Sequence, residues 1–360
     1  MSTLFFSSTL VSGLQNDSYK VSSAGTINYQ ISVPPDEVYC GFALPSNGII
    51  GSLWTREHFR KIKSWGFKDV LIDDIWWGRF VSQGGTYRKT RFARLDEAVQ
   101  WARSEGLNVG LSLRVCWDPT PEGADTSWWT DWSYDEVRDE QMPSHDYVNL
   151  EDEGRERYAS FVEFIVQRYP NCFYSLWHFP YHKQGVDSVR RNRFYAVTFP
   201  TLLGAVRKYS NNTIVFVPIH QGMSGNGEVA SYYETATPLD DPNIVYGLGH
   251  CMPWNVVDWG SWDYDFNRLD EAFEGIRRFR ETYDLPMFSV EFTPLRWSGN
   301  IDESRLACLE EVLKRTFQYE VGWAYHRISA SKRSGDNIIE DINDFEANLF
   351  ILTLLQENRG

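Results

Sequence analysis

Eight short apolar runs, separated by amphipathic helical patterns, constrain the fold of this chain more than any other feature. The runs are nearly continuous in apolar residues, as parallel strands covered on both faces should be. They span residues 38–44, 68–77, 108–117, 172–179, 213–219, 243–250, 286–293 and 321–328. In the helical pattern at 94–106, Leu95, Val99 and Ala102 recur at helical spacing and Gly106 follows as the stop. Eight strand–helix repeats predict an α/β protein with a (β/α)8 barrel.

The predicted organisation is a single domain. Residues 1–37 read as an irregular Ser/Thr-rich segment, and residues 38–360 as the barrel, closed by a last apolar helix at 342–356. A doubly wound open sheet is the main rival fold. Eight regular repeats and the lack of a Gly-rich phosphate-binding turn disfavour it.

Composition excludes several classes of partner. A net charge of −14 over 360 residues would repel nucleic acid, and no apolar run approaches the ~18 residues of a membrane-spanning helix. The five cysteines are scattered without a C-x-x-C pair, so we expect buried fillers and neither a disulfide framework nor a cysteine metal site. We expect a monomer without a cofactor. The first residues make a poor signal peptide as written, so the sequence leaves the compartment open, secretion included.

The carboxyl ends of the predicted strands carry most of the residues with chemical potential. In a (β/α)8 barrel the active site lies at this end. Five of the seven histidines follow predicted strands, whereas His58 falls in a helix and His145 in a loop. The strand-end residues are Asp73, Asp74, Trp76, Trp77, Arg114, Trp117, Asp118, His178, His182, His220, His250, Trp254, Glu291 and His326. This clustering of titratable groups indicates a functional site.

The chain is rich in tryptophan, with 15 residues. Trp54, Trp65 and Trp101 belong to helical patterns and should serve the core, whereas most others fall at strand ends and in loops. Exposed indoles there suit a flat, CH-rich ligand such as a sugar ring, although large loops also use aromatic filler. The long segment 118–146 holds Trp128 and Trp129, which would wall a sugar-binding cleft.

The order and spacing of several segments resemble glycoside hydrolase family 5, the cellulase-like barrels with retaining chemistry. The resemblance covers most of residues 38–357. "LWTREHFRKIKSWGFKDVLI" is similar to the first helix and second strand, and "RLDEAVQWARSEGLNVGLSL" to the next pair. "VYGLGHCMPWNVVDWG" resembles a His-x-Tyr-x-Pro segment, "PMFSVEFTP" the strand of the nucleophile, and "VGWAYHRIS" the last strand. The resemblance implies a glycan substrate, with Glu291 as nucleophile and His250 retained beside it.

Several positions depart from the family pattern in ways that affect the chemistry. The family's acid/base Glu falls at Phe179 and its sugar-binding Asn at His178. Four other positions differ: Leu71 stands for an Arg, Arg114 for a His, Met252 for a Tyr and His326 for a platform Trp. The proton donor of a family 5 enzyme is therefore missing from its usual place.

Three functions fit these residues. The first is a hydrolase of β-linked glycan with Glu291, His178, His250 and Asp74 as catalytic candidates. Its substrate contacts would be Arg114, Trp117, Trp128, Trp129, His182, His220, Trp254 and His326. The proton would come from Asp73, Asp74, Asp118, His178 or His182. The second is a catalytically inactive barrel that binds carbohydrate. The third is a metal-dependent hydrolase using the strand-end histidines, which lack a tight metal-binding spacing and are more simply explained by separate hydrogen bonds.

Overall fold

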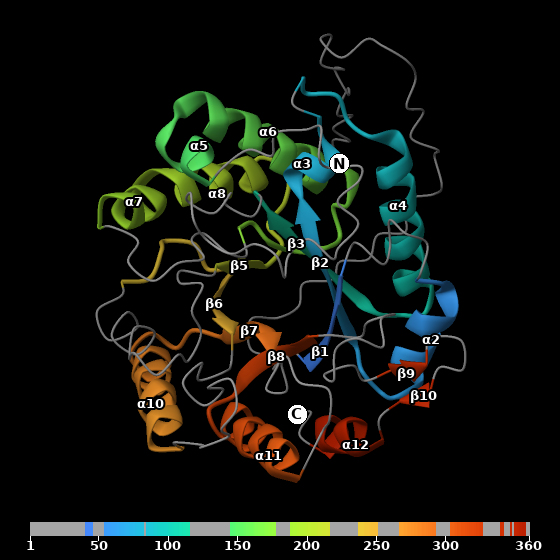
Figure 1. The fold of residues 1–360 in the computed structure, drawn as a ribbon. Helices are drawn as coiled ribbons and strands as arrows, with labels where there is room; N and C mark the ends of the chain where they lie inside the picture. The colour runs from blue at the N-terminus through green and yellow to red at the C-terminus, as the bar shows by residue number, and fades with distance from the viewer. Residues whose placement is uncertain are drawn as a thin grey trace, which may run out of the picture. The chain divides into compact units, whose positions relative to one another are not determined.

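The architecture is a closed barrel of parallel strands, seen in a computed structural model (Figure 1). The structure describes residues 40–45, 54–82, 84–115, 145–177, 188–216, 237–250, 266–292, 303–326, 339–341, 346–347 and 349–357. The predicted segment 1–37 lies outside these residues, so its boundary stays a prediction.

Each barrel strand falls on one of the eight predicted apolar runs. The strands are β1 (Cys40–Pro45), β2 (Asp69–Trp76), β3 (Asn108–Arg114), β4 (Phe173–Ser175), β5 (Ile214–Phe216), β6 (Ile244–His250), β7 (Met287–Phe292) and β8 (Val321–His326). Each pairs in parallel with its neighbour in sequence, and β8 pairs with β1 to close the ring. The predicted (β/α)8 fold is confirmed.

Helices lie outside the ring of strands (Figure 1). They are α2 (Arg56–Ser64), α3 (Trp77–Phe80), α4 (Lys89–Ser104), α5 (His145–Leu150), α6 (Asp152–Arg168), α7 (Ser188–Arg193), α8 (Phe199–Arg207), α10 (Phe266–Tyr283), α11 (Glu303–Gln318) and α12 (Leu349–Glu357), with a π-helical turn at Phe194–Thr198. His58 lies in α2 as predicted. The prediction for His145 was wrong, because this residue begins α5.

The start of the last helix was also predicted incorrectly. Residues Glu346–Ala347 form a short strand, β10, which pairs antiparallel with β9 (Ile339–Asp341), and α12 begins only at Leu349. Asn343 and Asp344 explain the difference, because such side chains compete with helical hydrogen bonds. The apolar spacing predicted a helix from residue 342, but the helix forms only from Leu349 onward.

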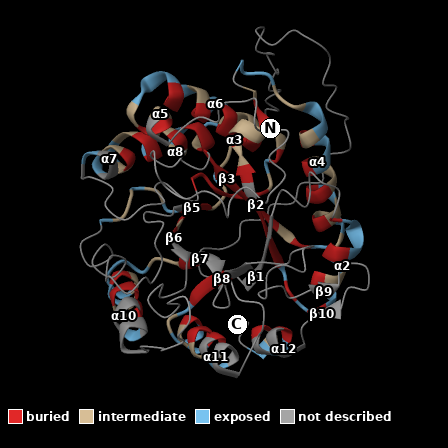
Figure 2. Cartoon of the chain, viewed as in Figure 1, coloured by how far each residue is buried: buried red, intermediate tan, exposed pale blue. Residues whose placement is uncertain are grey.

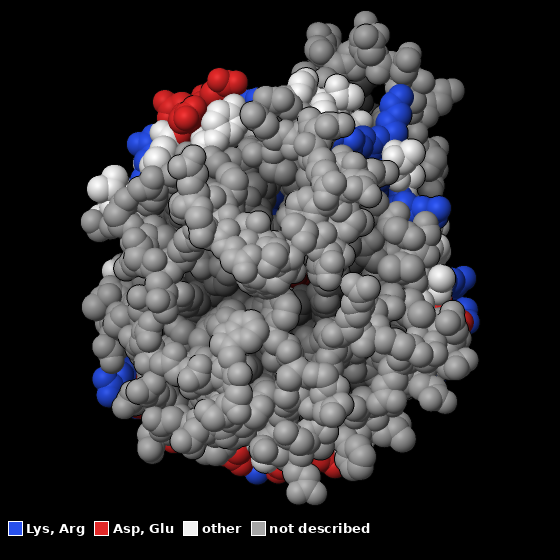
Figure 3. Space-filling model, viewed as in Figure 1, with Lys and Arg blue, Asp and Glu red and all other residues white. Residues whose placement is uncertain are grey.

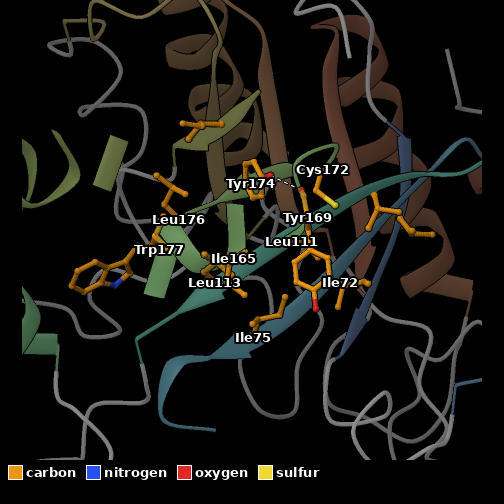
Figure 4. Close-up of a cluster of buried hydrophobic side chains, with 14 of the residues drawn as sticks. Ile72, Ile75, Leu111, Leu113, Ile165, Tyr169, Cys172, Tyr174, Leu176 and Trp177 are labelled. Atoms are coloured by element: carbon orange, nitrogen blue, oxygen red, sulfur yellow. Dashed lines mark hydrogen bonds between the residues drawn. The ribbon is translucent and has the colours of Figure 1, made fainter. Parts of the chain in front are cut away.

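One face of the strands packs against the helices and is apolar. Figure 4 shows Ile72 and Ile75 of β2, Leu111 and Leu113 of β3 and Ile165 of α6 in one cluster of buried hydrophobic side chains. These side chains are fully buried. Buried residues concentrate in the strands and on one side of the surrounding helices (Figure 2). We call the apolar face of the strands that packs against the helices the helix-facing side of the barrel wall.

Hydrogen bonds from buried tyrosines tie the same layer together. The Tyr158 hydroxyl donates to the Leu176 carbonyl at 2.8 Å, and the Tyr174 hydroxyl donates to the Tyr169 carbonyl at 2.6 Å. Cys172 is buried beside them, and burial raises the pKa of its thiol to about 11. Cys172 is therefore the inert filler that its sequence context predicted. The side chains of the other four cysteines lie outside the described residues.

The opposite face of β2, β3 and β4 points into the barrel. Leu71, Gly110 and Phe173 are register partners on it. A Cβ on Gly110 would lie 2.1 Å from the Phe173 ring and 2.8 Å from Leu71, so only glycine fits between these two side chains. Nearer the carboxyl ends the same face is polar, with Asp73, Ser112, Ser175 and Arg114 all buried.

Tryptophans in the helical patterns serve the core, as predicted. Trp54 and Trp65 are buried, and Trp101 is half-buried against the core. Across the described parts of the chain, no helix combines the length and the apolar character needed to span a membrane.

Candidate functional site

Five of the predicted site residues lie at or near the carboxyl ends of barrel strands. Because the eight strands run parallel, these ends share one mouth of the barrel. Arg114, His250 and His326 are the last residues of β3, β6 and β8, Glu291 is the penultimate residue of β7, and Asp74 lies two residues before the end of β2. Seven predicted site residues lie outside the described residues: Trp117, Trp128, Trp129, His178, His182, His220 and Trp254.

The backbone of Glu291 lies directly beside that of His250. The two residues are register partners across β6 and β7. On the side of β7 that pairs with β8, Ser289 pairs with Trp323 and Phe292 pairs with Tyr325. Two residues of β7 therefore stand opposite one residue of β8. This bulge contains Glu291. Bulges interrupt the regular alternation of a strand and are common next to active sites, where they re-aim a residue.

A second bulge lies in β2. Ile72 pairs with Leu111 and Ile75 with Leu113, so two residues of β2, Asp73 and Asp74, stand opposite one residue of β3. Both bulges fall in the carboxyl halves of their strands, and each carries an acidic residue predicted for the site. The sequence pattern did not reveal either bulge.

The β2 bulge contributes to a buried ion pair inside the barrel. Arg114 donates from Nη2 to the Asp73 Oδ2 at 2.7 Å, and the two side chains are only 6% and 0% exposed. Taking two charges out of water is costly unless they are paired with good geometry. The two opposite charges therefore cancel within the buried interior of the barrel.

The neighbouring interior positions are also polar. Ser112 and Ser175 are register partners on β3 and β4, and both are fully buried. Within the part of the chain that the structure describes, the Ser175 hydroxyl has no hydrogen-bond partner. A polar layer thus separates the apolar floor at Leu71 and Phe173 from the mouth.

Trp76 adds an aromatic side chain to this edge of the mouth. It is the last residue of β2 and the register partner of Arg114. It is half-buried, and the guanidinium of Arg79 lies over its ring, 4.2 Å from the centroid. Sequence analysis placed Trp76 at a strand end but did not choose it as a binding residue. Its neighbour Trp77 carried the same signal and is 4% exposed, packed in the core.

Other described charges on this side of the molecule lie at its margins. Figure 3 shows acidic side chains over α5 and α6, where Glu151, Asp152 and Glu153 are exposed, and basic side chains beside α4. Such solvated charges contribute little individually. The Asp73–Arg114 pair differs from them in being buried.

The described residues give no direct support to the metal-dependent alternative. No three His, Cys, Asp or Glu side chains among them come close enough together to hold a metal ion. Three of the histidines that such a site would use, at 178, 182 and 220, lie outside the described residues. The metal site stays a prediction.

Comparison with known proteins identifies the fold through structure alone. No protein-family model matches the chain, and no curated protein sequence matches it. Solved structures do match. The endoglucanase Cel5A from the hyperthermophilic Thermotoga maritima has a TM-score of 0.63 at 17% identity, covering 88% of this chain and 96% of its own. The family 5 xyloglucanase from Paenibacillus pabuli has a TM-score of 0.66 at 15% identity, covering 90% and 99%.

A third match is the cellulose synthase subunit Z from Clostridioides difficile, with a TM-score of 0.60 at 17% identity, covering 89% of this chain and 99% of its own. The matches extend over nearly the whole of each neighbour. The chain therefore has the (β/α)8 fold of family 5 glycoside hydrolases, and the resemblance seen in the sequence is confirmed at the level of the fold. A shared fold does not by itself assign an activity.

Proposed function

We propose that this protein acts on β-linked glycan as a divergent retaining glycoside hydrolase with Glu291 as its nucleophile. The observation that carries the proposal is the position of Glu291, in a bulge at the carboxyl end of β7 and in register with His250. A carboxylate at this end of a barrel strand is well placed to attack a substrate held over the mouth.

A retaining hydrolase needs a second group that protonates the leaving oxygen, and its carboxyl would lie about 5–5.5 Å from the nucleophile. Phe179 cannot supply that proton. Asp73 is a poor candidate, because its carboxylate is fully buried and accepts a hydrogen bond from Arg114. Asp74, in the same bulge, and the imidazoles of His178 and His182 are better candidates.

Carbohydrate complexes of the structural neighbours support the substrate class. Thermotoga maritima Cel5A has been solved with cellobiose and with mannotriose. For this chain we propose a glycan in the mouth, contacted by the following residues: Arg114, Trp117, Trp128, Trp129, His182, His220, Trp254 and His326. The two aromatic residues at 128 and 129 would form a wall of the site.

The reaction can be tested by the leaving group of the substrate. An activated aryl glycoside needs little protonation in the first step, whereas a natural glycan needs it. We expect slow turnover of activated aryl β-glycosides, much weaker action on polysaccharide, and loss of both in Glu291→Gln. A mechanism-based fluoroglycoside should label Glu291. The control is Glu310→Gln, which changes a carboxylate on α11 and should leave turnover unchanged.

Phe179 favours one other function, a catalytically inactive barrel that binds carbohydrate, since a missing proton donor is what relaxed catalytic demand would leave. Glycan binding without turnover of either substrate, and without labelling of Glu291, would establish that function. If the protein instead hydrolyses, Phe179→Glu together with His178→Asn should raise activity on natural glycan. Full activity on polysaccharide in the unaltered protein would show that another residue already donates the proton.

A further inference from the structure

The chain that leaves β4 stays fixed for two residues beyond the strand. The described pairing of β4 with β3 and with β5 ends at Ser175. Leu176 and Trp177 follow, are 0% and 2% exposed, and belong to the cluster of buried side chains in Figure 4. His178, a predicted site residue, comes next in the sequence. His178 itself lies outside the described residues, whereas the two residues before it do not.

One side chain of α6 holds both of these residues. The Tyr158 hydroxyl donates to the Leu176 carbonyl at 2.8 Å, and the Tyr158 ring meets the Trp177 ring edge-on, with centroids 5.8 Å apart. Phe194, in the π-helical turn, meets the Trp177 ring in the same way at 5.2 Å. A buried carbonyl beyond the end of a strand ladder needs another donor. Tyr158 supplies that donor and so extends the fixed part of β4.

The hydrogen bond from Tyr158 does not depend on pH in the neutral range. Its side chain is fully buried, and burial raises the pKa of the hydroxyl well above its usual range, because the charged phenolate would lose its hydration. The hydroxyl therefore stays protonated and keeps its bond to the Leu176 carbonyl.

We propose that Tyr158 is a positioning residue for His178, and that His178 donates the proton to the leaving group. This inference rests on the proposed function and chooses one donor from its candidates. A catalytic group must be held within about 0.5 Å of its working position. Each residue between a fixed point and a side chain adds two backbone rotations. His178, directly after Trp177, is therefore constrained more directly than His182.

The proton is needed in the step that breaks the glycosidic bond. A carboxylate oxygen of Glu291 bonds to the anomeric carbon as the bond from that carbon to the leaving oxygen breaks. The imidazolium of His178 gives its proton to that oxygen, so that a neutral alcohol leaves and a neutral imidazole remains. A dinitrophenolate leaves without this proton, whereas phenol and a sugar alcohol require it. Displacing the chain before His178 should therefore slow only the reactions that use the proton.

The test compares Tyr158→Phe with Tyr174→Phe. Each substitution keeps the ring and removes one buried hydroxyl that donates to a main-chain carbonyl. Tyr174 donates to Tyr169, which precedes β4 in the chain, so Tyr174→Phe is the matched control. The substrates are phenyl and dinitrophenyl β-cellobiosides and β-mannobiosides. Tyr158→Phe should lower kcat for the phenyl substrates roughly tenfold more than for the dinitrophenyl substrates, and Tyr174→Phe should show no such selectivity.

Two further measurements exclude a merely structural effect. The imidazole resonance of His178, assigned by its loss in His178→Gln, should shift in Tyr158→Phe and stay in place in Tyr174→Phe. In a His178→Gln background, Tyr158→Phe should cause no further selective loss on the phenyl substrates. Phe194→Leu weakens the other ring contact of Trp177 and should give a smaller loss of the same selectivity.

The possible failures are distinguishable. Equal losses on both leaving groups in Tyr158→Phe, or an unmoved His178 resonance, would overturn the inference and leave the proposed function intact. A selective loss that persists in the His178→Gln background would also overturn it, with Asp74 as the next donor to replace. No turnover of any substrate and no labelling of Glu291 in the unaltered protein would refute the proposed function and this inference with it. Melting temperatures show whether the variants fold, and Phe194→Leu decides if Tyr158→Phe does not.

Discussion

The two faces of strands β2 to β4 differ sharply although they share one backbone. The helix-facing side carries Ile72, Ile75, Leu111 and Leu113, which are fully buried among apolar neighbours. The interior side changes along its length, from the apolar contact of Leu71 and Phe173 to a polar layer that ends at Arg114. Alternation along a strand separates the two sets of side chains.

We expect the helix-facing side to contribute most to stability and the interior side to contribute most to the proposed chemistry. Burial of a large aliphatic side chain contributes about 1.5–3 kcal/mol to folding, so the helix-facing side is the main source of stability. A buried ion pair is weak evidence for stability, because desolvation offsets much of the attraction. Under the proposed function, the Asp73–Arg114 pair serves the chemistry of the site and is not a main source of stability. Four measurements can break or sharpen this comparison.

The largest effect should come from breaking the interior ion pair. Asp73→Asn leaves the buried guanidinium of Arg114 without its carboxylate and should lower the free energy of unfolding by about 3–5 kcal/mol. Urea denaturation measures this change. A loss below about 1 kcal/mol would mean that the pair is effectively solvated, as surface pairs are.

The paired replacement separates the two roles. Asp73→Leu with Arg114→Met removes both charges and fills similar volume, so it should be more stable than Asp73→Asn alone. The double variant should nevertheless bind neutral glycan more weakly than the unaltered protein. Retained binding would show that the pair is only structural.

On the helix-facing side, Leu111→Ala should lower the free energy of unfolding by about 2–5 kcal/mol, because it leaves a cavity among fully buried side chains. Glycan affinity at a temperature well below the melting point should stay as in the unaltered protein. A change in affinity without loss of stability would mean that the two faces are coupled, and the comparison would fail.

The smallest effect concerns a titratable group in the apolar layer. His58 of α2 is buried beside Trp54, and desolvation lowers its pKa from 6.5 to about 4. The unfolded chain therefore binds a proton at a higher pH than the folded protein does. The contribution of His58 to the free energy of unfolding is fully present above pH 6.5, and it falls by roughly 1–3 kcal/mol as the pH drops toward 4. Urea denaturation at a series of pH values measures the slope.

His58→Gln provides the control for that slope. The backbone N–H of Thr55 donates to the His58 Nδ1 at 3.1 Å, and glutamine is a usual acceptor at this third position of a helix. The variant should keep the helix start and flatten the pH dependence between 6.5 and 4. An unchanged slope would place its origin in another group.

The barrel could be predicted from the sequence because a strand that is buried on both sides forms a short apolar run. Such a run can be recognised without knowing which strand pairs with it. The sequence also placed Arg114, His250 and His326 at strand ends, because the end of each apolar run marks the end of a strand. The bulge at Asp73 and Asp74 was not predictable in the same way. It is defined by pairing with β3, more than 30 residues away, and no local pattern records that register.

The environment of Trp76 shows the same limit. Trp76 and Trp77 are adjacent and identical in type, and alternation alone does not say which one faces the core once a bulge precedes them. The later start of the last helix was accessible from the sequence, since Asn343 and Asp344 disfavour a helix at its predicted beginning. The remaining predicted site residues lie outside the described residues, so they stay predictions.

Closure of the barrel has a consequence for how the molecule is made. Strand β1 pairs on one side with β2, which follows it closely, and on the other with β8, near the far end of the chain. During synthesis the ring cannot close until β8 has left the ribosome, and until then β1 and β7 each present an unpaired edge. Such edges invite pairing with other chains, and distant pairing slows folding. The protein should therefore be most vulnerable to aggregation in the interval before its last strand emerges.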